Sequence, residues 1–125
     1  MIKTLVIFIG GGIGSVFRYL VSGWMYALLG PDFPFGTFAV NIIGSLIIGF
    51  FLTIAEDRFL VSPELRAFVA IGILGGFTTF STFTYETLGL FRDGSFFIGA
   101  TNIVLSIVVA LLAAWLGTLL GKLVI

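Results

Sequence analysis

The residues best suited to chemistry in this chain lie in one stretch, Gly72–Glu86, which reads GILGGFTTFSTFTYE. Hydroxyl side chains are interleaved with Phe rings there, and no Lys or Arg interrupts them. Hydroxyl donors can replace water lost by an anion, and the positive edge of a Phe ring can face an anion without holding it permanently. Conduction needs binding that is strong enough for entry and weak enough for exit. The stretch is therefore a candidate lining for the path of a small anion.

The same stretch lies inside a hydrophobic run, Leu65–Phe91, that is long enough to cross a bilayer. Gly75 and Gly76 are adjacent and a Thr78–Thr79 pair follows, and all four are poor helix formers. We therefore expect this helix to break near mid-membrane and restart. Broken backbone at membrane depth leaves carbonyl groups free to bind ions. A Gly/Thr face that packs against another helix is the alternative, and spacing alone does not separate the two.

The composition predicts an all-α polytopic membrane protein. Of the 125 residues, 59% are hydrophobic and 10% are charged, and the mean hydropathy is +1.25. A soluble domain of this size could not bury so much apolar surface. Six basic and six acidic residues give a net charge of zero and no indication of nucleic-acid binding. The chain has no His and no Cys, which removes the commonest metal ligand and general base.

Four spans in a single domain, residues 1–125, account for the hydrophobic pattern. Gly30–Pro34 and Arg92–Ser95 are predicted turns, because Gly and Pro punctuate the first and a polar Gly-containing run forms the second. Ser62 followed by Pro63 is typical of a helix start, with Ser as N-cap and Pro at the first helical position. The predicted spans are, approximately, residues 5–29, 35–55, 65–91 and 96–120.

The basic residues bear on orientation and on function. An even number of spans places both termini on one side, and only Arg92 clearly lies on the other. The positive-inside rule therefore favours cytoplasmic termini. Arg18 is the only basic residue well inside a span, which makes it a candidate functional residue. The alternative interpretation of Arg18 is that its side chain extends to the lipid headgroups and has no functional role. The basic residues on the side of the termini are Lys3, Arg58, Arg66 and Lys122.

Two further spans carry polar residues at helical spacing. Asn41 lies near the start of the second span, with Ser45 and Gly49 at the next two turns, so all three share a face that is expected to point inward. Asn102 and Ser106 form a similar pair in the fourth span. Such faces line an ion path or join helices by hydrogen bonds, which are common and modestly stabilising in membranes. The residues alone leave both interpretations open.

Small residues predict close packing between the helices. Gly10 and Gly14 are four apart in the first span, and Gly117 and Gly121 repeat the spacing in the fourth. This spacing lets membrane helices approach closely. A lone four-span bundle of this size encloses little space between its helices. We therefore expect an ion path to form between subunits, with a dimer as the simplest assembly.

The segment Gly75–Phe83, followed by Glu86, resembles the signature of the Fluc (CrcB) fluoride channels. Arg18 in the first span, Gly36–Thr37 and Asn41 at the opening of the second, and the four-span length match that family too, so the resemblance covers essentially the whole chain. It implies a fluoride-selective channel that exports fluoride passively across the plasma membrane, the inner membrane of a bacterium. It further implies relief of the cell from toxic fluoride.

The same resemblance implies site residues. Phe80 and Phe83 would supply a box of Phe rings, Ser81 and Thr82 would belong to a polar track, and Glu86 would lie near the end of that track. The full anion pathway expected on this basis is Asn41, Phe80, Phe83, Ser81, Thr82, Glu86, Ser106, Asn102 and Arg18.

The resemblance also implies an assembly and a cofactor. It indicates a multi-pass protein in the lipid bilayer, assembled with itself as an antiparallel homodimer that contains two pores. Gly75 and Thr78 would offer backbone carbonyls to a structural sodium ion at the break of the third span. Fluoride, the lipid bilayer and a second copy of the chain are thus the expected partners, and no nucleic acid is expected.

Three other classes compete with the channel interpretation. A small proton-coupled multidrug exporter is also four-span and dimeric, but it needs a carboxylate deep in the first span, where this chain has only Arg18. Glu86 is the sole carboxylate within a span, and it lies near one end. A non-transporting assembly subunit would explain the glycine faces but not the interleaved Phe and hydroxyl residues. An enzyme is least expected, because the chain has no His, no Cys and no clustered carboxylates at membrane depth.

Overall fold

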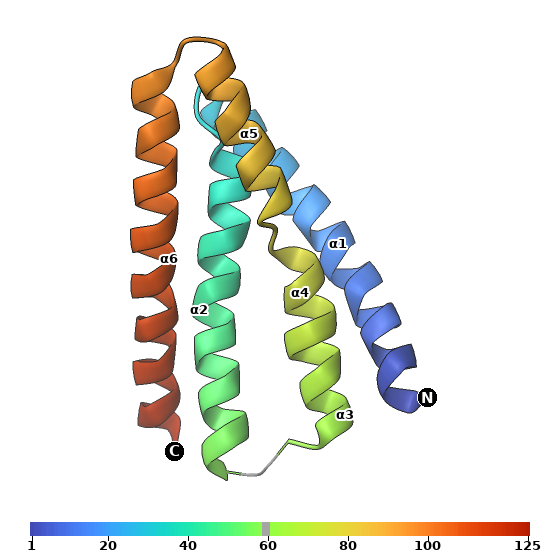
Figure 1. Cartoon of the computed structure of the whole chain (residues 1–125). Helices are drawn as coiled ribbons and strands as arrows, with labels where there is room; N and C mark the ends of the chain where they lie inside the picture. Colours follow the sequence, from blue (N-terminus) through green and yellow to red (C-terminus); the bar gives the residue numbers. More distant parts are fainter. Residues whose placement is uncertain (59–60) are drawn as a thin grey trace.

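The computed structural model describes residues 1–58 and 61–125, and its regular structure is helical (Figure 1). A short π-helical segment, η1, joins α3 to α4, so these three form one continuous helical stretch. The helices are α1 (Ile2–Leu29), α2 (Phe35–Arg58), α3 (Pro63–Arg66), η1 (Ala67–Ile73), α4 (Leu74–Phe77), α5 (Ser81–Arg92) and α6 (Phe96–Val124).

Within residues 1–58 and 61–125, four helical segments are long and apolar enough to cross a membrane. This confirms the prediction of an all-α chain with four apolar segments. The helical ends extend past the predicted apolar spans, since α1 begins at Ile2 and α6 ends at Val124. The two termini lie at the same end of the molecule, as the even number of spans requires (Figure 1).

Local sequence explains where the helices begin and end. The Ser62 hydroxyl accepts a hydrogen bond from the Leu65 N–H at 3.1 Å, with Pro63 as the first residue of α3, which confirms the predicted start. The turn after α1 contains Gly30 at φ 87°, and the turn before α6 contains Gly94 at φ 80°. Only glycine adopts this left-handed backbone without steric cost, so both turns depend on it.

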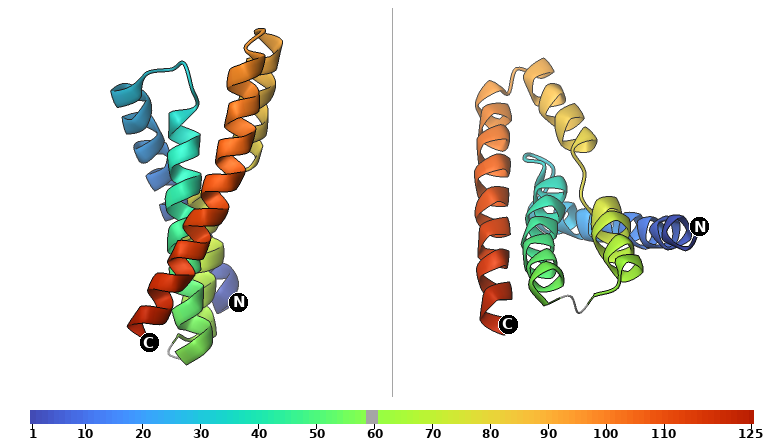
Figure 2. Two further views of the ribbon diagram at one scale, coloured as in Figure 1. Left: turned by 90° about the vertical axis from the view of Figure 1, so that its left-hand side faces the viewer. Right: turned by 60° about the horizontal axis from the view of Figure 1, so that its bottom comes forward.

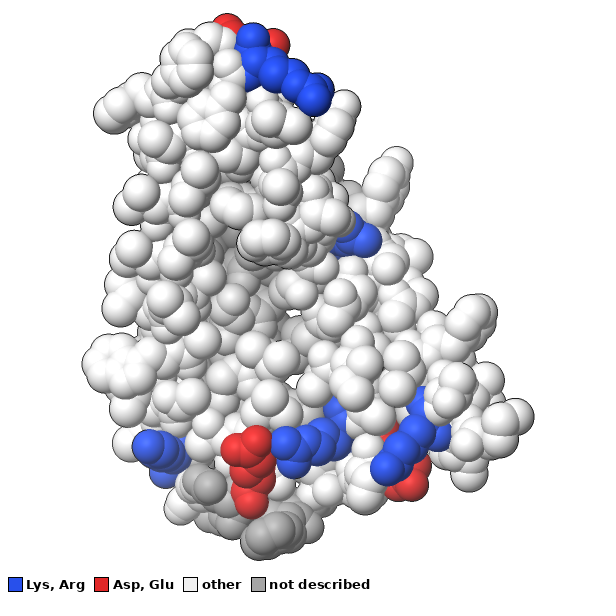
Figure 3. Space-filling view, viewed as in Figure 1, with Lys and Arg blue, Asp and Glu red and all other residues white. Residues whose placement is uncertain are grey.

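The helices pack in two groups that share α2. In one group α1 lies along η1 and α4, and in the other α6 lies along α2 and meets α5 near its own N-terminal end. Figure 2 shows that the α5–α6 hairpin and the α1–α2 hairpin diverge towards the end of the molecule opposite the termini. The charged residues gather at the two ends, and the surface between them is almost entirely uncharged (Figure 3). That distribution suits a chain whose middle faces hydrocarbon.

Glycines set the closest helix contacts, as the spacing predicts. A Cβ added at Gly14 would overlap the backbone of Ile73, and one at Gly10 would lie 2.6 Å from the Phe68 carbonyl oxygen. In the other group, a Cβ at Gly117 would overlap the Leu46 carbonyl oxygen. Backbones therefore touch backbones in both groups, which is the packing that small residues permit in membranes.

We expect Gly14→Ala to destabilise the folded protein while Gly12→Ala does not. The added methyl at Gly14 meets the rigid backbone of Ile73, whereas a Cβ at Gly12 has nothing within 4 Å. Overpacking of this kind costs about 1–3 kcal/mol. Thermal unfolding of the purified protein in detergent measures the difference. Equal unfolding temperatures for the two variants would contradict the tight α1–η1 contact.

Candidate functional site

The helical path is interrupted between α4 and α5. Thr78 is extended, with φ −89° and ψ 160°, and α5 begins only at Ser81. The Thr78 N–H donates to the Leu74 carbonyl at 3.1 Å, but the next N–H, that of Thr79, turns away and donates to Asn41 of α2. In a continuing helix the Thr79 N–H would donate to the Gly75 carbonyl. The Gly75 carbonyl is thus left without its helical donor.

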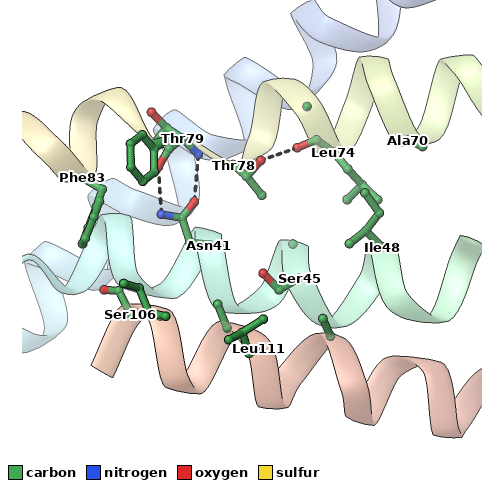
Figure 4. A pocket seen from close by; sticks show the side chains of 16 residues that line it. Asn41, Ser45, Ile48, Ala70, Leu74, Thr78, Thr79, Phe83, Ser106 and Leu111 are labelled. Atoms are coloured by element: carbon green, nitrogen blue, oxygen red, sulfur yellow. Dashed lines mark hydrogen bonds between the residues drawn. The ribbon is translucent and has the colours of Figure 1, made fainter. Parts of the chain in front are cut away.

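Asn41 bridges the interruption with two hydrogen bonds (Figure 4). Its Nδ2 donates to the Thr79 carbonyl oxygen at 2.9 Å, and its Oδ1 accepts from the Thr79 N–H at 2.8 Å. The side chain therefore satisfies both backbone groups of one residue, and it forms the interhelical hydrogen bonds that were one interpretation of its position. An amide nitrogen carries two hydrogens, so one remains for another acceptor.

The side chain of Thr79 starts the next helix. Its Oγ1 accepts from the Thr82 N–H at 3.2 Å and lies 3.5 Å from the Ser81 hydroxyl. A hydroxyl that accepts from an N–H three residues later satisfies one of the unpaired donors at a helix start. Thr79, which precedes the N-cap residue Phe80, therefore stabilises the start of α5 through its side chain.

A hollow of about 500 Å³ lies beside the interruption, lined by residues of α2, η1, α4, α5, α6 and the link. We call it the Phe hollow. Phe80 and Phe83 both line it, with ring centroids 5.6 Å apart and ring planes tilted by 45°. Phe80 is 78% exposed and Phe83 only 9%. The hollow brings together six of the residues expected at the site: Asn41, Gly75, Thr78, Phe80, Phe83 and Ser106.

A second hollow of about 410 Å³ contains Arg18 and is called here the Arg hollow. Arg18 is half-buried in it, and in the part of the chain that the structure describes no carboxylate pairs with it. Thr79 lines both hollows, so they adjoin at the interruption. The other polar residues of the Arg hollow are Ser15, Tyr19, Ser22, Tyr26, Thr37 and Thr82.

Glu86 lies outside both hollows, and both of its carboxylate oxygens accept hydrogen bonds from hydroxyls. Oε2 accepts from the Tyr26 hydroxyl at 2.8 Å, and Oε1 accepts from the Thr37 hydroxyl at 2.5 Å. The carboxylate thereby joins α5 to α1 and α2. The sequence did not connect Tyr26 with Glu86, because they are 60 residues apart and no local pattern relates them.

Asn102 is 1% exposed and lies between α5 and α6. Its Oδ1 accepts from the Ser106 hydroxyl at 3.1 Å, and its Nδ2 donates to Thr87 Oγ1 at 2.9 Å. Thr87 in turn donates to the Phe83 carbonyl oxygen at 2.7 Å. Of these four hydrogen-bonded residues, only Ser106 and Phe83 line the Phe hollow. The expected site residues that line neither hollow are Ser81, Glu86 and Asn102.

Comparison with known proteins assigns the family. Residues 5–118 match the family model described as CrcB-like protein, Camphor Resistance (CrcB). A relative from Geotalea daltonii is 51% identical over 114 residues, which cover 90% of this chain and 92% of the relative. Relatives from Geotalea uraniireducens and Coxiella burnetii are 46% and 45% identical, and each match covers 96% or more of both chains. Each of the three carries the name fluoride-specific ion channel FluC. With its four apolar helices and a match over nearly its whole length, the chain belongs to the CrcB-like family.

Proposed function

We propose that this protein is a fluoride-selective channel that carries fluoride passively across the plasma membrane and lowers its cytoplasmic concentration. The observation that carries the proposal is the Phe hollow, where two Phe rings, an asparagine amide and hydroxyl groups gather and no charged residue lines the wall. An anion there meets weak, replaceable partners, which is what conduction requires. The name that the relatives carry supports fluoride as the ion.

We propose different roles for the two hollows along the anion path: the Arg hollow attracts the anion, and the Phe hollow replaces the water that it loses. Arg18, free of a carboxylate partner among the described residues, attracts anions into the Arg hollow, since a lone charge in a cleft raises the local concentration of counter-ions. Thr79 lines both hollows, so the proposed path runs past this residue into the Phe hollow. There the remaining amide hydrogen of Asn41 and the positive edges of Phe80 and Phe83 replace the water that the ion loses.

The functional form that we propose is an antiparallel homodimer whose third span is broken at mid-membrane. Helical stretches of comparable length, residues 63–77 and 81–92, lie on either side of the interruption, which supports a central depth for it. Exposed polar backbone is not tolerated against lipid, so the Phe hollow needs cover. A two-fold axis in the membrane plane would carry the interruption of one subunit onto that of its partner and close the hollow with a second copy.

A structural sodium ion fits the donor groups at the interruption. The Gly75 carbonyl lacks its helical donor, and the carbonyl of the extended Thr78 follows the end of α4. Carbonyl oxygens at a helix interruption suit hard cations. Gly75 and Thr78 of two subunits would hold the ion, which would join the two interruptions by electrostatic attraction.

Reconstitution tests the activity directly. Purified protein in liposomes should release fluoride down its concentration gradient without a proton gradient, and chloride efflux should stay at the level of protein-free liposomes. Ion-selective electrodes measure both. Equal chloride efflux would contradict the selective channel, and fluoride efflux that requires a proton gradient would favour a coupled exporter.

Phe80→Ile should lower fluoride efflux by about tenfold, the factor that 1.4 kcal/mol represents, because Ile keeps bulk but lacks the positive ring edge. Phe80 is 78% exposed, so the substitution costs little folding stability. Phe97→Ile is the matched control: Phe97 is 84% exposed on α6 and lines neither hollow. Wild-type efflux in both variants would assign Phe80 to packing.

Accessibility tests the antiparallel assembly in this cysteine-free chain. Leu123→Cys, 82% exposed beside the intact Lys122, should react with a membrane-impermeant thiol reagent about equally from both sides. Asp93→Cys lies in the turn between α5 and α6, and that turn is at the end of the molecule opposite the termini (Figure 1). It should react in the same way, and acidic residues weigh little in orientation. Labelling of the two cysteines from opposite single sides would rule out the antiparallel dimer.

A further inference from the structure

Ser45 lies one helical turn after Asn41 on the same face of α2, and it lines the Phe hollow (Figure 4). The anion path proposed above does not use it. Ser45 is half-buried, so the residue is neither fully packed away nor fully exposed. The question is what the hydroxyl hydrogen binds.

Several hydroxyls of this chain donate to the carbonyl four residues earlier, which is a common local partner for Ser and Thr. Ser45 does not follow this pattern, because its hydroxyl does not donate to the Asn41 carbonyl and, within residues 1–58 and 61–125, no other group receives its hydrogen. The pairs that follow the pattern are Thr53 with Gly49, Thr78 with Leu74, Thr84 with Phe80, and Thr87 with Phe83, at 2.7–2.9 Å.

The other hydroxyls of the Phe hollow are already engaged. Thr78 donates to the Leu74 carbonyl at 2.9 Å, and Ser106 donates to Asn102 at 3.1 Å. Thr79 contacts the Ser81 hydroxyl at 3.5 Å. A hydroxyl has a single hydrogen, so Ser106 as it stands offers the hollow only oxygen lone pairs, which repel an anion. In the contact between Thr79 and Ser81 either hydroxyl could be the donor. Among the described residues of this wall, Ser45 is the hydroxyl with no hydrogen-bond partner at all.

We propose that Ser45 contacts fluoride directly and that its hydroxyl donates to the ion together with the remaining amide hydrogen of Asn41. Residues four apart on a helix have Cβ atoms roughly 5–6 Å apart. An ion that accepts from two donors at about 2.7 Å each spans a similar distance. The hollow contains no carboxylate that would repel the ion. This inference rests on the proposed fluoride channel and adds a binding residue to it.

The test is the half-saturating fluoride concentration of efflux for Ser45→Ala. Alanine is smaller than serine and a better helix former, so a residue that only fills space predicts unchanged or faster efflux. A lost donor predicts a half-saturating concentration about tenfold higher, since hydrogen bonds to charged groups are among the stronger ones. Thr53→Val is the matched control, because Thr53 lies on the same helix, lines neither hollow and already donates to Gly49.

The outcomes separate this inference from the channel proposal. Wild-type half-saturation in an assembled, conducting Ser45→Ala protein would overturn the role of Ser45 and leave the channel intact. If a higher sodium concentration restores the half-saturating fluoride concentration of Ser45→Ala to the wild-type value, the Ser45 oxygen binds sodium. That result would also overturn the proposed contact between Ser45 and fluoride. Absence of fluoride efflux from the wild type and from Thr53→Val would instead overturn the channel. Should Ser45→Ala not assemble, Ser45→Cys replaces it: its weak S–H donor predicts a smaller increase, and no increase would again contradict the inference.

Discussion

The structure depends on the paired hydrogen bonds between Asn41 and the backbone of Thr79. A helix cannot stop inside hydrocarbon unless its free backbone groups find partners, because each unsatisfied group costs several kcal/mol. The Asn41 amide provides a donor and an acceptor at once, so one side chain replaces the missing helical partners of one residue. Because the Thr79 N–H donates to Asn41, the Gly75 carbonyl loses its helical donor. The second amide hydrogen of Asn41 remains available beside the Phe hollow. The proposed sodium and fluoride sites thus both follow from one pairing.

Close helix packing explains why the hollows lie at the surface of a single chain. Glycines bring α1 against η1 and α4, and α6 against α2, until backbone meets backbone. Little room remains inside either group, and the polar groups therefore collect where the groups diverge. Such surfaces need cover in a membrane. A second copy of the chain would supply that cover without any additional protein, which is why the proposed channel and the proposed dimer belong together.

Hydrogen bonding also separates the candidate functions. A proton-coupled exporter needs a titratable group that exchanges protons in the transport path. Glu86 is the only carboxylate within the apolar part of a span among the described residues, and its two oxygens accept hydrogen bonds from the hydroxyls of Tyr26 and Thr37. It lines neither hollow. Among the residues of the first helix that line the Arg hollow, the charged one is the cation Arg18. The arrangement therefore favours an anion path over proton exchange, in agreement with the family to which the chain belongs.

The sequence by itself determined the features that depend on neighbours along the chain. Apolar length predicted four spans, four-residue glycine spacing predicted the close contacts, and Ser62 with Pro63 predicted a helix start, because each is set by residues within a few turns. Only the tertiary structure decided which polar side chains form hydrogen bonds with residues far away in the sequence. Asn41 meets Thr79 across 38 residues, and Glu86 meets Tyr26 across 60. Such pairs depend on how whole helices cross, which no local spacing encodes. For that reason local spacing did not show that Asn102 is a buried link between helices, or that the Ser45 hydroxyl has no hydrogen-bond partner among the described residues.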